Sequence, residues 1–396
     1  MAHSLRSNSS GRKTMNQIKR RERLLIGILV VVIMIGALAL IRSQPWGRLD
    51  LRLIKPNTPN WIVCVRLNED AHGDIVVILP DGQMRMLTED AFDDRSPDWA
   101  PDGKKIVFSS NRRDLVYQLW TIDPDGKGLS QLTIGGGAKL APYYDRDGQH
   151  ILHVAQGLVT EVDVKGVHSL QLIPSASQMT QVREQYGQIT FRYAKRPNHD
   201  LIAAVQRIDD GEQVVLQDMT KAQQQFTLPV LIGGEQVDLD WSPTGQSLVV
   251  SGAGLVIPTP DGEQRMGGVI RFDFGDGMND VKPLPLWLSS DNSQAAIEVV
   301  WSPDGARVAF VLCEQLKNGE LKRIGLATVP ESGGAPTLIV EGEVFHPHWS
   351  PDGQHLVFAM GKPGDRQIYT VRIDGTNLKQ RTQSGDYITP KWSPAR

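Results

Sequence analysis

Trp349-Ser350-Pro351-Asp352-Gly353 decides the fold, because the chain repeats this stretch. The same five residues stand at 301–305. Near copies begin at Trp99, Tyr144 and Trp241, and a shortened copy begins at Trp392. In this motif proline favours a turn, aspartate accepts hydrogen bonds from nearby backbone, and glycine adopts a left-handed conformation without steric cost. Recurrence of this kind indicates a repeat architecture.

A short run of β-forming residues follows each glycine turn, as at 105–108, 307–310 and 355–358. A third run and a second glycine turn come next, followed by a fourth run that ends near Thr133 or Thr382. Apolar and β-branched runs bounded by turn residues are typical of strands. Each repeat therefore predicts four antiparallel strands, which form the blade of a β-propeller.

The aromatic positions of the motif give the number of blades: 99, 144, about 193, 241, 301, 349 and 392. The third copy is degraded around Tyr193. Residues 61–88 supply three strands without a first strand, and 387–394 supply a first strand alone. One blade shared between these two ends closes the ring and leaves no sheet edge open. We expect an all-β, seven-bladed propeller at 59–396; the alternative has six blades, with the repeat near Tyr193 as an insertion.

A single apolar segment precedes the repeats. Residues 1–23 form a short basic tail, and 24–41 carry no charged or polar side chain. A helix over 24–41 would be about 27 Å long, enough to cross a bilayer and contact membrane lipid. The basic residues before it predict a cytoplasmic N-terminus, and 42–58 are expected to be a linker. The prediction is a single-pass signal anchor in the cell membrane with an extracytoplasmic propeller; a signal peptide cleaved near Ala39 is the alternative.

Charge and cysteine content narrow the function classes. The chain carries a net charge of −3 and residues 1–42 carry +7, which leaves about −10 for the rest. An acidic domain argues against nucleic acid as a partner. The two cysteines, Cys64 and Cys313, fall on equivalent strands of separate blades. That separation exceeds the reach of a disulfide, so we expect no disulfide and two buried free thiols.

The motif strings resemble a known family. Trp-Ser-Pro-Asp-Gly followed by a β run, together with Ile-Asp-Pro-Asp-Gly at 122–126 and Gln-Leu-Thr at 131–133, resembles the TolB-like, WD-type β-propeller repeats. Similar repeats occur in the propellers of prolyl-oligopeptidase-type peptidases. The resemblance covers 61–396 and implies the fold. We expect the chain to lack both the small α/β domain of the TolB-like proteins and a peptidase domain, since no Gly-x-Ser-x-Gly elbow occurs.

No motif for catalysis, metal or cofactor is present: the chain has no Cys-x-x-Cys, His-Glu-x-x-His, phosphate loop or EF-hand loop. We therefore predict no cofactor, no metal and no enzymatic activity. The motif aspartates are interpreted as turn caps and the motif tryptophans as packing between blades.

Ionisable residues cluster just before the motif tryptophans, where first strands enter the central channel. They are Asp98, Asp240, Glu298, His346, His348 and Lys391. We nominate them as a possible ligand-binding site at the channel entrance. Solvation of the channel is the alternative, and a metal held by Asp98, Asp240 and His348 has no supporting spacing.

Long loops on the same face are the second candidate, because variable loops on a rigid scaffold often bind partners. The longest is Gly252–Gly268, with Arg265 and Met266, and others are 314–322 and 175–188. These features predict a membrane-anchored scaffold that binds a protein or polymer outside the membrane. The alternatives are a propeller lyase or hydrolase acting on an extracellular polymer through the channel-mouth residues, and an envelope sensor or assembly component.

Overall fold

The computed structural model describes residues 60–155, 158–166, 168–173, 192–208, 211–218, 225–232, 236–259, 262–275 and 281–394. They belong to one compact unit, Pro56–Arg396. The expected tail, membrane segment, linker and 175–188 loop lie outside the described residues. Among the residues that are described, no helix has the length and apolarity needed to cross a membrane.

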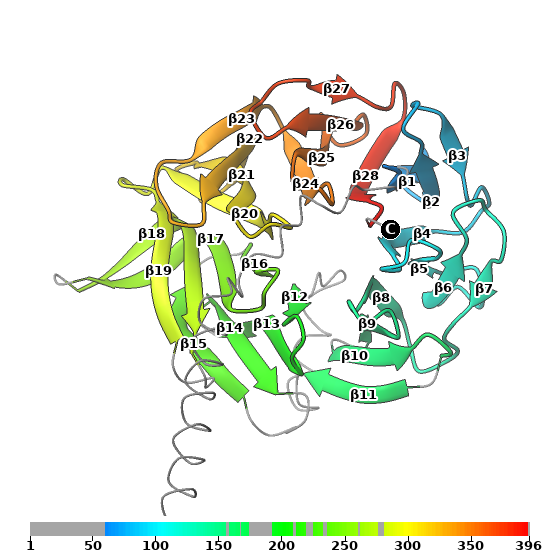
Figure 1. Ribbon diagram of the computed structural model, residues 1–396, viewed down its shortest axis with the longest axis horizontal. Coiled ribbons are helices and arrows are strands. Elements are labelled where there is room, and N and C mark those ends of the chain that lie inside the picture. The colour runs from blue at the N-terminus through cyan, green and yellow to red at the C-terminus, as the bar shows by residue number, and fades with distance from the viewer. Residues whose placement is uncertain are drawn as a thin grey trace, which may run out of the picture. The chain divides into compact units, whose positions relative to one another are not determined.

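The described residues form a ring of seven blades (Figure 1). Blade 1 contains β4 (Asp94–Trp99), β5 (Ile106–Ser110), β6 (Gln118–Ile122) and β7 (Ser130–Gln131). Blade 2 contains β8 (Lys139–Tyr144), β9 (His150–Ala155), β10 (Leu158–Asp163) and β11 (His168–Ile173). Blade 3 contains β12 (Tyr193–Lys195), β13 (Leu201–Ile208), β14 (Gly211–Asp218) and β15 (Gln225–Ile232).

The remaining blades complete the circle. Blade 4 contains β16 (Asp238–Trp241), β17 (Ser247–Thr259), β18 (Gly262–Phe274) and β19 (Val281–Leu288). Blade 5 contains β20 (Gln294–Trp301), β21 (Arg307–Gln315), β22 (Leu321–Pro330) and β23 (Thr337–Glu341). Blade 6 contains β24 (Val344–Trp349), β25 (His355–Met360), β26 (Gln367–Arg372) and β27 (Lys379–Gln380). Blade 7 contains β28 (Asp386–Trp392), β1 (Ile62–Leu67), β2 (Gly73–Ile78) and β3 (Met84–Met86).

Blade 7 joins the two ends of the described chain, because β28 pairs antiparallel with β1 from Ile62↔Trp392 to Leu67↔Asp386. All strands within a blade are antiparallel, and the seven-bladed fold predicted from the repeats is confirmed. Blades 3 and 4 differ from the others. A single pair between β15 and β17, Ile232↔Leu255, joins them into one eight-stranded sheet.

The third repeat was misplaced by two residues. In every blade with a motif, the aromatic residue pairs with the residue seven positions later, as Trp99 does with Ile106. In blade 3 the residue that does so is Lys195, paired with Ile202, and not Tyr193. Tyr193 instead packs its ring 5.6 Å from that of Tyr143 in blade 2. A lysine in place of the aromatic residue hid the true register from the sequence.

The expected long loop Gly252–Gly268 is a second correction. Its residues continue β17 and β18 as a ladder that runs to Thr259↔Gly262. We call residues 255–266 of this hairpin the arm. The signal was present in the sequence: a Leu255-Val256-Ile257 run followed by Pro260-Asp261-Gly262, the same turn chemistry as the motif. Arg265 and Met266 therefore lie in a strand and not in a loop.

The core lies between and within the blades. The motif tryptophans are buried, with 3–6% of their surface exposed. Trp349, for example, packs with Val311 of blade 5 and Phe358 of blade 6. Trp99 packs with Val77 of blade 7. Burial of a large aromatic side chain contributes strongly to stability, so these residues hold adjacent blades together, as the sequence indicated.

Loops alternate between two faces of the ring. The turns joining first to second strands contain the motif and lie on one face, which we call the turn face. Aspartates cap these turns: Asp304 Oδ1 accepts the Ala306 N–H at 3.0 Å, and Asp352 Oδ1 accepts the Gln354 N–H at 3.0 Å. The hairpins joining second to third strands, including the arm, lie on the opposite face, the arm face.

Candidate functional site

First strands carry a β-bulge just before the motif aromatic residue. The ladders shift register between Arg95 and Asp98, and between Phe345 and His348. In five blades the residue three before the aromatic position has a positive φ of 48–54°: Ser96, Ala141, Glu298, His346 and Thr389. A residue other than glycine in this conformation loses about 1 kcal/mol of stability, because its Cβ crowds the backbone. A bulge changes the direction of the neighbouring side chains, and in these blades the side chains after the bulge point toward the next blade.

In blades 1, 2, 4 and 6 the side chain directly before the aromatic position binds the next blade. Each accepts a hydrogen bond from the backbone N–H at that blade's aromatic position. The pairs are Asp98 Oδ2 with Tyr144 at 2.8 Å, Tyr143 Oη with Lys195 at 2.8 Å, Asp240 Oδ2 with Trp301 at 2.8 Å, and His348 Nδ1 with Trp392 at 3.4 Å. We call this set the inter-blade ring. It includes three of the nominated residues.

A second set of contacts lies two residues earlier. Asp238 Oδ2 accepts the Glu298 N–H at 2.7 Å, and Glu298 Oε2 accepts the His346 N–H. Arg192 pairs with Asp238 at 3.2 Å, and Arg323 pairs with Glu298 at 2.6 Å. These contacts connect blades 3 to 6. The network is charge-balanced, with two arginines for two carboxylates.

Lys391 closes the ring. Its Nζ lies 2.8 Å from Asp98 Oδ1, and its backbone oxygen accepts the Trp99 indole N–H at 3.3 Å. Within blade 7, where β28 and β1 meet, the Ser393 N–H donates to Trp61 O at 2.8 Å. Blade 7 is therefore fastened to blade 1 through side chains, and its own two chain ends are fastened to each other.

Burial tunes the ionisation of these groups. It raises the pKa of Asp238 and of Asp240 to about 6. Burial, helped by the Lys391 charge, lowers the pKa of His348 to about 4. Burial alone would raise the pKa of Glu298, but its contacts with His346 and Arg323 outweigh burial, and the pKa is lowered. At neutral pH the carboxylates are ionised and His348 is a neutral acceptor, which suits their contacts with backbone N–H groups.

The nominated residues therefore all lie at contacts between blades. The expected position at the entrances of the first strands is wrong for four of them, because Asp98, Asp240, His348 and Lys391 are each the penultimate residue of a first strand, next to the turn face. Asp98, Asp240, Glu298 and His348 accept backbone hydrogen bonds, and Lys391 pairs with Asp98. His346 differs, because its Nδ1 is buried without a hydrogen-bond partner among the described residues, and burial lowers its pKa. A general base needs a free acceptor. His348 uses Nδ1 to accept the Trp392 N–H, so it would have to release the next blade before acting as one.

One cluster was not anticipated from the sequence. Ligand atoms of Asp145, Asp147 and His150, on the turn face of blade 2, lie within 4.8 Å of one another. His150 Nδ1 is 2.5 Å from Asp147 Oδ2, and Lys195 pairs with Asp145. A cation therefore already balances this group, and a metal ion would have to displace it. The signal was the Asp-x-Asp-x-x-His spacing inside the weak second copy of the motif.

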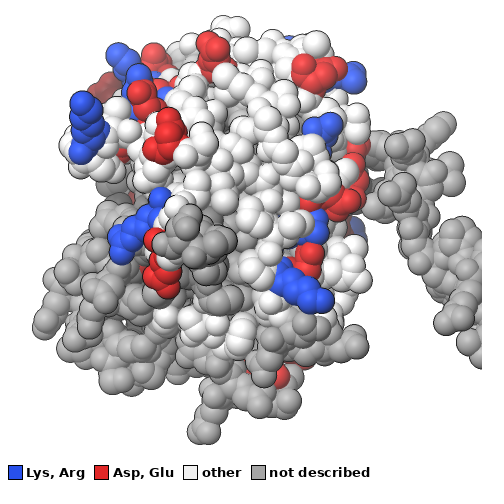
Figure 2. Space-filling view, turned by 90° about the vertical axis from the view of Figure 1, so that its left-hand side faces the viewer, with Lys and Arg blue, Asp and Glu red and all other residues white. Residues whose placement is uncertain are grey.

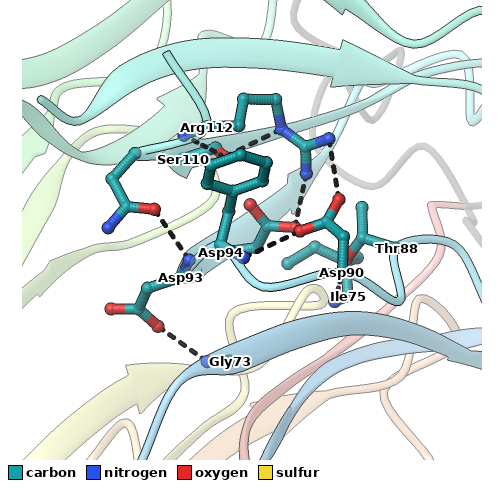
Figure 3. Close-up of polar contacts among 10 residues, drawn as sticks. Gly73, Ile75, Thr88, Asp90, Asp93, Asp94, Ser110 and Arg112 are labelled. Carbon is teal, nitrogen blue, oxygen red and sulfur yellow. Dashed lines mark hydrogen bonds and ion pairs between the residues drawn. The ribbon is translucent and has the colours of Figure 1, made fainter. Parts of the chain in front are cut away.

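A buried ion pair anchors the arm-face end of blade 1 (Figure 3). The Arg112 guanidinium lies 2.7 Å from Asp94 Oδ2 and 3.1 Å from Asp90 Oδ2. Asp93 Oδ1 accepts the Gly73 N–H at 2.6 Å, which ties blade 1 to blade 7. The sequence did not suggest these residues, and their contacts are again structural.

Cys64 and Cys313 are buried and free. Burial raises the pKa of the Cys313 thiol to about 12 and that of Cys64 further still. Thiolate is the reactive form of cysteine, so neither thiol is a nucleophile at neutral pH.

The outer side of blade 4 is shown in Figure 2. Charged side chains of both signs are scattered there around an uncharged area, and no single-sign patch is visible. Residues 282–285 of the outer strand β19 are exposed. Pro283 and Pro285 of that strand lack the N–H groups that another strand would need for pairing, so they protect the sheet edge.

Comparison with known proteins gives the class of protein as a β-propeller. No family model matches the chain. An uncharacterized peptidase of Bacillus subtilis, YuxL, is 29% identical over 114 residues, which is 27% of this chain and 17% of the relative. The uncharacterized protein Atu1656 of Agrobacterium fabrum is 32% identical over 100 residues, covering 24% of this chain and 31% of the relative. The chain thus spans less than a third of the length of each.

Solved structures resemble the chain more extensively. The Pseudomonas aeruginosa periplasmic gluconolactonase PpgL has a TM-score of 0.54 at 13% identity, covering 86% of this chain and all 100% of PpgL. An oligogalacturonate lyase from Vibrio parahaemolyticus has a TM-score of 0.52 at 13% identity, and the match covers 82% of this chain and 86% of the lyase. TolB from Acinetobacter baumannii has a TM-score of 0.49 at 16% identity, and the match covers 85% of this chain and 67% of TolB. The similarities to the gluconolactonase and the lyase show the fold alone.

Proposed function

We propose that the chain is a non-enzymatic binding scaffold, held at the outer side of the cell membrane by residues 24–41, that recognises a protein or polymer through its arm face. The arm is the single observation that carries this proposal. Its strands continue past the other strands of blade 4, and it projects beyond the ring at the left of Figure 1. Leu255 and Val256 at the base of the arm are buried, but residues 262–265 are exposed and add little core. Ordering an exposed hairpin costs backbone entropy, so binding is a physical reason to keep one.

The base of the arm is rigid, which suits recognition. Gly267 N–H donates to Asn292 Oδ1 at 2.9 Å, and Gly267 O accepts the Ser289 N–H at 2.8 Å. Gln315 of blade 5 donates to Ala253 O. Toward the tip, residues 262–265 are exposed, while Met266 is half-buried. A preorganised base with an exposed tip lowers the ordering cost of binding.

An enzyme of the lyase or hydrolase type is less well supported. It would use His348, Asp240 and Glu298 at the channel mouth, but each of these side chains accepts a backbone N–H from the next blade. A role as an envelope sensor or assembly component is compatible with the arm and differs only in the identity of the partner.

The binding role is tested by shortening the arm. Replacing Ile257–Gln264 by Asn-Gly keeps the Val256↔Arg265 pair and closes it with a favoured two-residue turn. Full-length protein and the shortened variant, both tagged, are cross-linked in intact cells and purified from detergent-solubilised membranes. We expect a partner that co-purifies with the full-length chain to be lost from the variant at unchanged melting temperature. Equal recovery from both would contradict the proposal.

The anchor is tested separately. Washing membranes at alkaline pH should leave the chain in the membrane pellet, and deletion of 24–41 should release it. Release of the intact chain by the wash would contradict membrane anchoring without bearing on the arm.

A further inference from the structure

Three departures from the repeated motif fall in consecutive blades. Arg146 stands where other copies have proline, Arg196 stands where four copies have serine, and Thr244 stands where four copies have aspartate. The regular copies fold without these substitutions. A local explanation is therefore needed for their concentration in blades 2, 3 and 4.

Both arginines reach the same turn, which is the motif turn of blade 4. Arg146 Nη1 donates to Pro243 O at 2.8 Å, across from blade 2. Arg196 Nε donates to Gly245 O at 2.5 Å, from blade 3. The two acceptor carbonyls are only two residues apart, a span of at most about 7 Å between their Cα atoms. Two guanidinium groups therefore lie close together on the turn face.

Aromatic rings hold Arg196 in place. Its guanidinium carbon lies 5.4 Å from the centroid of Trp241 and 5.4 Å from that of Phe274. Such stacking leaves the edge of the guanidinium, with its N–H donors, available for planar acceptors. Burial lowers the pKa of Arg196, although an arginine stays charged throughout the physiological range.

Neither arginine forms an ion pair with a carboxylate of the described residues. The nearby carboxylates are already engaged: Asp145 pairs with Lys195, Asp147 pairs with His150, and Asp240 accepts the Trp301 N–H. A regular copy would place an aspartate at position 244, within the turn that both arginines contact. Because Thr244 stands there, the turn has no carboxylate that would neutralise the two arginines.

Turn stability does not explain the threonine. Thr244 Oγ1 accepts the Gln246 N–H at 3.4 Å, whereas the aspartates of regular copies accept the equivalent N–H at about 3.0 Å. Threonine is thus the poorer cap. The exchange gives a weaker hydrogen bond and leaves a hydroxyl group, not a carboxylate, in the turn that both arginines contact. The charge of Arg146 still acts on the buried Asp240 carboxylate, whose pKa it lowers, but the two do not form a direct ion pair.

We propose that Arg146, Arg196 and Thr244 form an oxyanion-binding site on the turn face, which takes a phosphate or carboxylate group of a ligand. Arginine forks match both groups in shape and charge. Each arginine uses one nitrogen for the turn carbonyl, and its other guanidinium nitrogens face the ligand. This site lies on the face opposite the arm, so its existence does not depend on the function proposed for the arm.

The test uses the full-length chain in detergent and titrates inorganic phosphate and acetate separately by calorimetry at constant ionic strength. We expect saturable binding of at least one anion at one site per chain. Phosphate alone assigns a phosphorylated ligand, and acetate alone assigns a carboxylate ligand. No saturable binding of either would overturn the proposal.

Variants locate the binding. Thr244→Asp restores the regular motif, so it should keep the melting temperature and abolish binding. Arg146→Gln, at an exposed position, should weaken binding roughly tenfold, the effect of losing one charge-assisted contact. Arg372→Gln is the matched control, because Arg372 is exposed on blade 6 and near Asp374. Unchanged binding by Thr244→Asp, or an equal loss in Arg372→Gln, would overturn the assignment.

Discussion

Lys391 Nζ lies 2.8 Å from Asp98 Oδ1, although 293 residues separate them in the chain. The other oxygen of Asp98 accepts the Tyr144 N–H. One carboxylate thus connects blade 7, blade 1 and blade 2. Because blade 7 contains both ends of the described chain, this contact stands where the ring must close.

Removing this carboxylate should destabilise the whole ring. We expect Asp98→Ala to lower the free energy of unfolding by about 2–4 kcal/mol, since it leaves Lys391 without its partner and the Tyr144 N–H unsatisfied. Asp98→Asn keeps an acceptor and should cost about 1 kcal/mol. Urea denaturation followed by tryptophan fluorescence measures both. The control is Lys104→Ala, which breaks an exposed pair with Asp102 and should cost less than about 1 kcal/mol. Equal effects of all three would refute a closing role.

Deleting β28 tests closure of the ring directly. A chain ending at residue 385 would expose the edge of β1 along its whole length. Unpaired strand edges promote association, so we expect loss of the cooperative unfolding transition and oligomers in size-exclusion chromatography. A chain ending at residue 394 should behave like the full-length protein. A monomeric, cooperatively folding truncation at 385 would show that the closure is dispensable.

Asp240 gives a pH-dependent test. Its folded pKa is raised to about 6, above the unfolded value of about 3.9, so its contribution to stability is greatest below pH 4 and is lost as the pH rises through 6. Asp240→Asn cannot ionise but can still accept the Trp301 N–H. The stability of this variant relative to wild type should therefore rise between pH 4.5 and pH 7.5, by about 1–3 kcal/mol. His348 also titrates in this window but is common to both proteins. A difference that is flat, or that falls with pH, would contradict the burial of this carboxylate.

The thiols give a simple check on blade packing. Cys64 and Cys313 are both buried, with 0% of their surface exposed. We expect no reaction with a thiol reagent within minutes in the native state and two equivalents per chain in denaturant. Fast reaction of one thiol in the native protein would mean that its blade is packed differently. Reaction of fewer than two in denaturant without reductant would reveal a disulfide.

The sequence was most informative where turn chemistry repeats. Trp349 and Trp301 mark their turns through an unchanged five-residue motif, and the blade count follows from their spacing. It was least informative where one substitution breaks the pattern: Lys195 occupies an aromatic position, so the register of blade 3 was lost. The arm was missed because the sequence Pro260-Asp261-Gly262 was interpreted as part of a long loop.

The candidate site shows a different limit. Asp98, Asp240 and His348 were expected at first-strand entrances, but each is the penultimate residue of its first strand, next to the motif turn. Their partners are backbone N–H groups of the following blade. Backbone donors carry no sequence signature, and the bulges that aim these side chains lie at residues as different as Ser96 and Glu298. The hydrogen-bond partners of these side chains therefore follow from the folded structure and not from the sequence. The meeting of Arg146 and Arg196 at Pro243 and Gly245 could not be predicted either, because their acceptors are backbone carbonyls.

The inter-blade ring is expected to hold the blades together, and the arm is expected to bind the partner. The most direct measurement is the dissociation constant of the co-purified partner for three proteins: wild type, the arm variant with Ile257–Gln264 replaced by Asn-Gly, and Asp240→Asn. We expect the arm variant to bind about a hundredfold more weakly, as for loss of an interaction hot spot. We expect Asp240→Asn to bind as wild type does. Weakened binding by Asp240→Asn, with unchanged binding by the arm variant, would instead place recognition at the inter-blade ring and rule out recognition by the arm.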